Sequence, residues 1–167
     1  RGRLMGTFAE DAAQSYQFSR EQQDAYAIAF LERAVKAGKD GSFADEIAPV
    51  KVKTRKGETT VAIDEQPGKA QIDKIPTLKP AFREGGTVTA ANSSSISDGA
   101  AAVTMMRRSE AEKRGLTPIA TIIGHSTHAS TPGLFPSAPV GSINRLLGRI
   151  GWSAKDVDLW EVNEAFA

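Results

Sequence analysis

Cysteine is absent from the 167 residues. This absence excludes disulfides, thiolate metal sites and a thiol nucleophile within the sequence. Histidine occurs only twice, at His125 and His128. A metal site would need further ligands of suitable type near these two residues, and none is apparent in the sequence. We therefore expect no bound metal, and two histidines also leave little for a catalytic base.

Neither sign of charge dominates, since the sequence has 21 Lys and Arg residues and 20 Asp and Glu residues. Nothing in this balance calls for a nucleic acid or a membrane surface as a partner. The sequence also lacks an apolar run of transmembrane length and a signal-peptide pattern. We expect a cytoplasmic protein, or an organellar one if the source is eukaryotic. Because the sequence opens at Arg1 without Met and closes on an apolar run, we also expect a fragment of a longer protein.

The first 38 residues predict two helices. Thr7 and Glu10 have the spacing of a Thr-x-x-Glu capping box, and Ser19 with Gln22 repeats the pattern. Apolar residues recur at helical spacing after each pair. Gly38 is a favoured residue for the position just past a helix end. The total of 40% hydrophobic residues is enough for a buried core.

The middle of the sequence predicts a hairpin followed by an irregular loop. Apolar residues alternate over 47–52 and again over 59–63, on either side of Arg55-Lys56-Gly57. The basic residues here fit a solvated strand edge, and a polyphosphate partner is the alternative. Residues 66–80 contain three prolines and few apolar residues, which favours a loop without regular structure.

The second half of the sequence alternates predicted strands with predicted helices, which is typical of α/β layers. The predicted strands are 88–91, 100–106, 119–123 and 156–162. Ser109, paired with Glu112, and Ser142 are the expected helix caps.

Two polar stretches follow predicted strands. Asn163 and Glu164 end the last one, where ligands bind in open α/β sheets. A capping or turn role is the alternative. The Asn-Ser-Ser-Ser run at 92–95 would let a ligand lie close to the main chain, and a plain turn is its alternative.

Four stretches in the same order resemble the thiolases, the acyl-CoA acyltransferases that join or split 3-ketoacyl-CoA. The stretches are Met5-Gly6-Thr7 with Ala9-Glu10, the run from Ser19 to Asp24, the run from Gly86 to Ser94 continued by Asp98 to Ala102, and Asn163-Glu164-Ala165-Phe166. Four ordered matches are much more specific than any single one. The resemblance covers nearly the whole chain.

The resemblance implies an α/β fold with the layered αβαβα arrangement of thiolases, present here only in part. Residues 1–97 would form the loop domain that lies over CoA. Residues 98–118 would end the amino-terminal core half, and residues 119–167 would begin the carboxyl-terminal core half.

The resemblance also implies the roles of individual residues. Asn163 would hold a water that forms an oxyanion hole together with the histidine of a Gly-His-Pro segment, which this sequence lacks, and Glu164 would orient its neighbours. Ser94 and the backbone of Ala90 would bind the pantetheine arm of CoA. The expected pocket walls are Phe82, Met5, Phe166 and Phe135, and the expected phosphate contacts are Lys69 and Lys74. From the sequence alone, Met5 also fits an ordinary packing role.

The implied reaction joins two acetyl-CoA into acetoacetyl-CoA, or runs in reverse, through a cysteine thioester. CoA thioester is the substrate, no covalently bound cofactor is expected, and the parent protein is expected to be a homodimer or homotetramer. Without a cysteine, the chain by itself is predicted to be inactive. Two alternatives are a non-catalytic CoA-binding or scaffolding module of thiolase fold and a lipid-binding relative. The intact Asn163-to-Phe166 motif argues against the lipid-binding relative.

Overall fold

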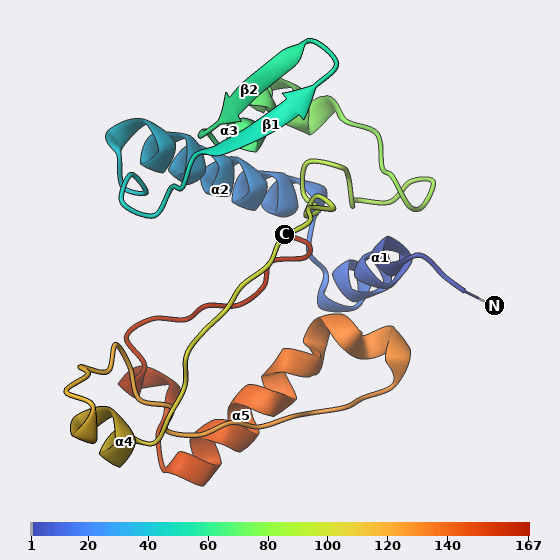
Figure 1. Ribbon diagram of the computed structural model, residues 1–167. Coiled ribbons are helices and arrows are strands. Elements are labelled where there is room, and N and C mark those ends of the chain that lie inside the picture. Colours follow the sequence, from blue (N-terminus) through green and yellow to red (C-terminus); the bar gives the residue numbers. More distant parts are fainter. Residues whose placement is uncertain (1) are drawn as a thin grey trace. The chain divides into compact units, whose positions relative to one another are not determined.

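The computed structural model describes residues 2–167. The chain forms two compact units, which we describe separately. Unit 1 comprises the chain up to Ser94 together with Glu164–Ala167, and unit 2 comprises Ser95–Asn163. Figure 1 shows their elements, coloured along the sequence.

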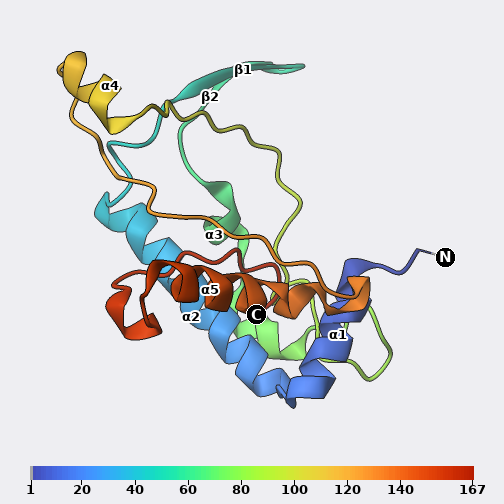
Figure 2. The ribbon, with the colours of Figure 1, turned by 90° about the horizontal axis from the view of Figure 1, so that it is seen from below.

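Unit 1 begins with helices α1 (Met5–Tyr16) and α2 (Arg20–Asp40), which meet at the corner formed by residues 17–19 (Figure 2). Gln17 ends α1 in the left-handed conformation, at φ 59°. The predicted capping box of α2 is confirmed, because Ser19 and Gln22 bond each other's backbone N–H.

Two other predictions about these helices are wrong. Leu4 caps α1, and Thr7 lies inside the helix with its hydroxyl donating to the Leu4 carbonyl at 2.7 Å. The Glu10 side chain turns away to bond residues far along the chain. Helix α2 runs past Gly38 to Asp40, and Gly41 ends it at φ 78°. Glycine tolerates that left-handed conformation without steric cost.

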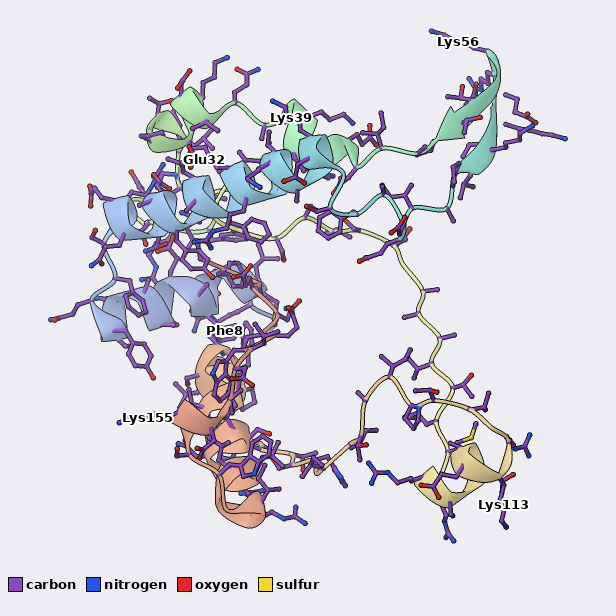
Figure 3. All side chains as sticks on the ribbon, turned by 90° about the vertical axis from the view of Figure 1, so that its left-hand side faces the viewer. Phe8, Glu32, Lys39, Lys56, Lys113 and Lys155 are labelled. Carbon is purple, nitrogen blue, oxygen red and sulfur yellow. The ribbon has the colours of Figure 1, made fainter. Side chains whose placement is uncertain are left out.

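The predicted hairpin is confirmed as the antiparallel strands β1 (Val50–Thr54) and β2 (Gly57–Val61). Gly57 opens β2 at φ 118°, a value that side chains disfavour. Lys56 lies at the tip of the hairpin (Figure 3). All residues of both strands are exposed.

The segment after the hairpin is more regular than its prolines suggest, so the predicted irregular loop is wrong. It contains α3 (Glu65–Lys69) and the 3₁₀ helix η1 (Ile72–Thr77). Asp64 caps α3 by accepting the N–H of Gln66. Arg20 of α2 donates to the carbonyls of Ile75 and Leu78, at 3.0 and 2.9 Å, and so ties η1 to α2.

Unit 2 contains α4 (Arg108–Lys113), the 3₁₀ helix η2 (Pro132–Ser137), α5 (Ala138–Ile150) and the 3₁₀ helix η3 (Ala154–Asp156). The 124–128 segment runs along α5. The Ser126 hydroxyl donates to the Ser142 carbonyl at 2.6 Å, and Arg145 donates to the Thr127 carbonyl at 2.7 Å.

The predicted caps of the unit 2 helices are wrong, although both helices exist. α5 begins at Ala138, so Ser142 lies inside it and its hydroxyl bonds the Ser126 carbonyl. α4 begins at Arg108, with Arg107 before it and no side-chain cap. Ser109 therefore sits in the first turn of the helix.

The four strands predicted for 88–91, 100–106, 119–123 and 156–162 are also wrong. Over residues 2–167, the hairpin is the only ladder, apart from an isolated bridge between Ser93 and Phe166. A strand requires a neighbour to bond its backbone. Within the described residues none of these segments pairs in a ladder with a second strand, and the apolar side chains of 100–106 and 119–123 are exposed.

Candidate functional site

The segment from Ala81 to Ser94 is fixed to α1 by a buried carboxylate. Glu10 is 3% exposed, and its oxygens accept the backbone N–H groups of Thr87 and Val88 at 2.9 to 3.0 Å. Gly86 permits this approach, because a Cβ at Gly86 would lie 2.2 Å from Oε1 of Glu10. Burying a charge is favourable only with such bonds.

A second buried contact fixes the same segment to α2. The Asn92 amide donates to Oδ1 of Asp24 at 3.2 Å and to the Thr87 carbonyl at 3.0 Å, and its oxygen accepts the Thr89 N–H at 2.7 Å. Asp24 is also paired with Arg20 at 2.6 Å. These bonds use the Asn92 side chain to shape the backbone that leads to Ser94.

The last four residues join this framework. The Ser94 N–H donates to the Ala165 carbonyl, and the Ala167 N–H donates to the Asn92 carbonyl, both at 2.9 Å. Ser93 and Phe166 form an antiparallel bridge between these bonds. Residues 92–94 and 165–167 thus pair as a very short two-stranded contact within unit 1.

Glu164 has a side-chain partner on α2. The Tyr26 hydroxyl donates to Oε1 of Glu164. This hydrogen bond raises the pKa of Tyr26 above its usual value, and burial and the negative charge of Glu164 add to the rise. A neutral phenol can donate to the carboxylate, whereas a phenolate would repel it.

Two aromatic rings form an apolar wall beside the paired residues. Phe82 and Phe166 meet edge to face, with ring centroids 6.3 Å apart and planes at 84°. The Phe82 ring packs on Gly6 so closely that a Cβ there would lie 2.3 Å from the ring. Met5, the first residue of α1, precedes this glycine and is 55% exposed.

The structure places most of the predicted site residues in unit 1. Phe82, Ala90, Ser94, Glu164 and Phe166 lie on the two segments that the bonds above bring together. Ala90 and Ser94 are both exposed.

The remaining predicted site residues lie elsewhere. Asn163 and Phe135 belong to unit 2, where Asn163 is exposed and immediately precedes Glu164 in the sequence. Lys69 on α3 forms an ion pair with Glu65, and Lys74 lies exposed on η1.

Unit 1 has a surface depression away from these residues. This depression of about 430 Å³ lies over the carboxyl-terminal half of α2, and Glu32 and Lys39 on that half are labelled in Figure 3. It contains none of the predicted site residues. Within residues 2–167, no cluster of three or more His, Cys, Asp or Glu side chains could hold a metal.

Sequence reasoning missed the residues that hold this site in place. The sequence pattern assigns Glu10 to a helix cap and Asn92 to a ligand-binding loop or a plain turn, and it predicts no bond between Tyr26 and a distant residue. The available signal was polar residues on the buried helix faces, where Glu10 adjoins Ala9 and lies one turn from Ala13. A polar side chain at such a position implies a partner in another segment.

Family comparisons cover almost the entire chain. The model of the thiolase N-terminal domain matches residues 1–109, and that of the thiolase C-terminal domain matches residues 116–167. An acetyl-CoA acetyltransferase of Paracoccus denitrificans is 46% identical over 98% of this chain and 42% of its own length. A mouse cytosolic acetyl-CoA acetyltransferase is 45% identical over the same shares of the two chains. The chain thus spans about two fifths of the length of these relatives.

Solved structures agree with the sequence relatives. The acetyl-CoA acetyltransferase of Bacillus anthracis superposes with a TM-score of 0.92 at 38% identity, over 99% of this chain and 42% of that one. The human mitochondrial 3-ketoacyl-CoA thiolase superposes with a TM-score of 0.83 at 37% identity, over 97% and 41%.

Proposed function

Because the chain belongs to the thiolase family and adopts part of its fold, we propose that the protein containing it is an acetyl-CoA C-acetyltransferase. Two acetyl-CoA would give acetoacetyl-CoA and free CoA, and thiolysis would run the reverse reaction. The predicted family and the partial thiolase fold are confirmed by the matches along the chain. The proposed division into 1–97, 98–118 and 119–167 remains a prediction.

One observation carries the proposal most strongly. The motif Asn163-Glu164-Ala165-Phe166 does not stand alone, because Ala165 and Phe166 contact residues 82–94, which contain another of the four stretches that resemble thiolases. Ala165 bonds Ser94, Phe166 meets Phe82, and Glu164 bonds Tyr26 of α2. Two stretches that resemble the same active site are therefore joined in one unit.

We assign CoA binding to the exposed edge of this unit. Ser94 and the Ala90 backbone would bond the pantetheine amides, and Phe82, Phe166 and Met5 would line the apolar side. The role of Phe135 as a pocket wall stays a prediction. Lys69 and Lys74 would contact phosphates. The Ser94 hydroxyl is suited to this role because Ser94 is exposed and its backbone N–H, which donates to the Ala165 carbonyl, holds the residue in place.

In the proposed reaction, a cysteine outside this chain carries the acetyl group as a thioester. A second cysteine outside this chain would accept a proton from the α-carbon of the second acetyl-CoA. The resulting enolate carbon attacks the thioester carbonyl, and the first cysteine leaves as a thiolate. Asn163 would hold the water that stabilises the enolate oxygen, and Glu164 would keep the motif oriented. Positioned donors at a developing oxyanion are commonly worth a factor of about 10² to 10³ in rate.

Cellular location and assembly are proposed by analogy with relatives. One curated relative is named cytosolic and another, from Gibberella zeae, mitochondrial. We propose a cytoplasmic protein, or an organellar one in a eukaryote, that assembles as a homodimer or homotetramer. In the described part of the chain, no helix combines the length and apolar character of a membrane span.

The second candidate function is a non-catalytic CoA-binding or scaffolding module. It is favoured by one observation, the complete absence of cysteine from these 167 residues. Both candidates predict that the purified chain does not cleave acetoacetyl-CoA. They differ in whether the surrounding coding sequence supplies a nucleophilic cysteine, a Gly-His-Pro segment and a second cysteine near the carboxyl terminus.

The test has two parts. Thiolysis is assayed with the purified 167-residue chain, and CoA binding is measured by calorimetry for the chain and its Ser94→Ala variant. We expect no thiolysis and an approximately 5-fold loss of CoA affinity, the equivalent of one hydrogen bond of about 1 kcal/mol. Ser95→Ala is the control, because the Ser95 hydroxyl bonds Ser97 within the loop. Cysteine-independent thiolysis would contradict the proposed chemistry.

A further inference from the structure

Tyr26 joins two distant parts of the chain in unit 1. It lies on α2 and is 46% exposed, and its hydroxyl donates to a Glu164 oxygen across a separation of 138 residues. Its neighbours on α2, Asp24 and Ala27, are 4% and 7% exposed. α2 is therefore fixed in unit 1 by buried residues close to Tyr26.

Each residue of the closing segment 164–167 is held by a different contact. Ala165 and Ala167 are held through backbone bonds to Ser94 and Asn92. Phe166 is held by its ring contact with Phe82 and its bridge to Ser93. Glu164 is held through its side chain, by Tyr26. The first residue of the segment thus depends on a contact that a single substitution can remove.

The chemistry of the Tyr26 contact is specific to a tyrosine. A phenol donates one strong hydrogen bond, and a carboxylate acceptor makes that bond stronger than a neutral one. Phenylalanine would keep the ring and lose the donor. The charged groups that act on Tyr26 are Glu164, which favours the neutral phenol, and Arg33 on the same helix, which opposes it.

We propose that Tyr26 is a positioning residue of the acyl-CoA site: by holding Glu164, it keeps the segment 164–167 paired with residues 92–94 and so keeps Ser94 in place to bind CoA. Tyr26 itself contacts neither the substrate nor the reacting atoms. This inference rests on the proposed function, since it assigns the Ser94 edge to CoA.

The first test is spectroscopic and needs no ligand. The chain contains two tyrosines, so ¹³Cζ-tyrosine labelling gives one signal each for Tyr16 and Tyr26. In Glu164→Gln at neutral pH, the Tyr26 signal should shift while the Tyr16 signal stays in place. Glutamine keeps the length of the side chain and removes its charge. An unmoved Tyr26 signal would overturn the contact.

The second test measures CoA affinity by calorimetry. Tyr26→Phe and Glu164→Gln should each weaken binding about 5-fold, and the double variant should bind no more weakly than either single one, because the two residues form one contact. Tyr16→Phe is the matched control, since Tyr16 is exposed and stacks on Phe18. Unchanged affinity in Tyr26→Phe would overturn the positioning role.

The two tests separate failure of this inference from failure of the proposed function. If the unmodified chain does not bind CoA, the assignment of the Ser94 edge to CoA fails and the positioning role fails with it. The Tyr26 signal still shows in that case whether the contact with Glu164 exists. If the unmodified chain binds CoA and Tyr26→Phe binds it with the same affinity, the proposed function stands and the inference is wrong.

Discussion

Glu10 fixes the backbone around Thr87 by hydrogen bonds from its buried side chain. It is 3% exposed and accepts two backbone N–H groups, and the Thr87 hydroxyl donates to it at 3.3 Å. Glu10→Ala leaves these donors buried without a partner, so the free energy of unfolding should fall by about 2 to 4 kcal/mol. Urea unfolding of the purified chain measures this change.

Glu32→Ala is the control for that experiment, because Glu32 is an exposed glutamate on α2. Exposed substitutions of this kind usually change the free energy of unfolding by less than about 0.5 kcal/mol. Equal effects of the two substitutions would show that the Glu10 contacts with Thr87 and Val88 contribute nothing to stability.

Asp40 at the end of α2 should titrate far from its ordinary range. The Lys36 ammonium beside it, helped by bonds from the Ser42 hydroxyl and N–H, lowers the pKa of Asp40 to about 2. A lowered folded-state pKa stabilises the fold above the unfolded pKa of about 4, and this contribution is lost as the pH falls towards 2. Carboxyl NMR titration should show an upward shift in Lys36→Met. A pKa near 4 in the unmodified chain would contradict this interpretation.

Residues that act over short sequence distances could be predicted, and those that act over long distances could not. The Ser19–Gln22 capping box was predicted because its partners are three residues apart. Glu10 has the spacing of the same motif, but it bonds Thr87, which is 77 residues away. Only the structure shows whether such a carboxylate caps its own helix or accepts backbone N–H groups from a distant segment.

At the scale of elements, the loop before Ser94 can approach α1 only because Gly86 has no side chain. A Cβ there would lie 2.2 Å from Glu10, whose oxygens are held by backbone donors and cannot move without losing them. Gly86→Ala should therefore lower the free energy of unfolding by about 1 to 3 kcal/mol, as overpacking typically does.

Gly68→Ala on α3 is the matched control for Gly86→Ala. A Cβ at Gly68 meets nothing within 4 Å, so this substitution should leave stability unchanged or raise it by about 0.4 to 1 kcal/mol. Equal denaturation midpoints for Gly86→Ala and the unmodified chain would refute the close approach of loop and helix.

The helices α1, α2, α4 and α5 and the hairpin were predictable from sequence, whereas the strands predicted for the second half do not form. A helix and a two-residue hairpin turn satisfy most of their backbone bonds locally. The 100–106 segment has a strand-like composition, but within the described residues no neighbouring strand bonds it. The pattern of apolar residues in a segment cannot show whether a second strand is present to bond its backbone.

At the scale of the whole molecule, the exposed area is large for the mass. It amounts to 14,032 Å², whereas a folded monomer of 17.8 kDa exposes about 8,000 Å². Exposed apolar side chains contribute to the excess, and Ile96, Ile119 and Ile122 are 102%, 105% and 72% exposed. Large apolar surfaces of this kind associate with other surfaces or with hydrophobic dyes.

The isolated chain should therefore bind the dye ANS strongly and associate with rising concentration in analytical ultracentrifugation. The double variant Ile119→Lys, Ile122→Lys should bind less dye, because it replaces exposed apolar groups with charges. Dye fluorescence no higher than that of a compact monomer of similar mass would show that the chain buries these side chains.

Membership of the thiolase family could be predicted from four short motifs, because they occur in this chain in the same order as in thiolases. The positions of the site residues could not. Ser94 and Ala165 lie 71 positions apart, and only the structure shows that they share a hydrogen bond. We propose that this chain carries the CoA-binding loop and the Asn163 motif of an acetyl-CoA acetyltransferase.

The most direct measurement is thiolysis of acetoacetyl-CoA by the product of the complete coding region that contains this chain. We predict that this product bears a nucleophilic cysteine and converts acetoacetyl-CoA and CoA into two acetyl-CoA, and that Asn163→Ala lowers kcat about 10² to 10³-fold. A product without cysteine that cleaves no acetoacetyl-CoA, or an activity that is indifferent to Asn163→Ala, would contradict the claim.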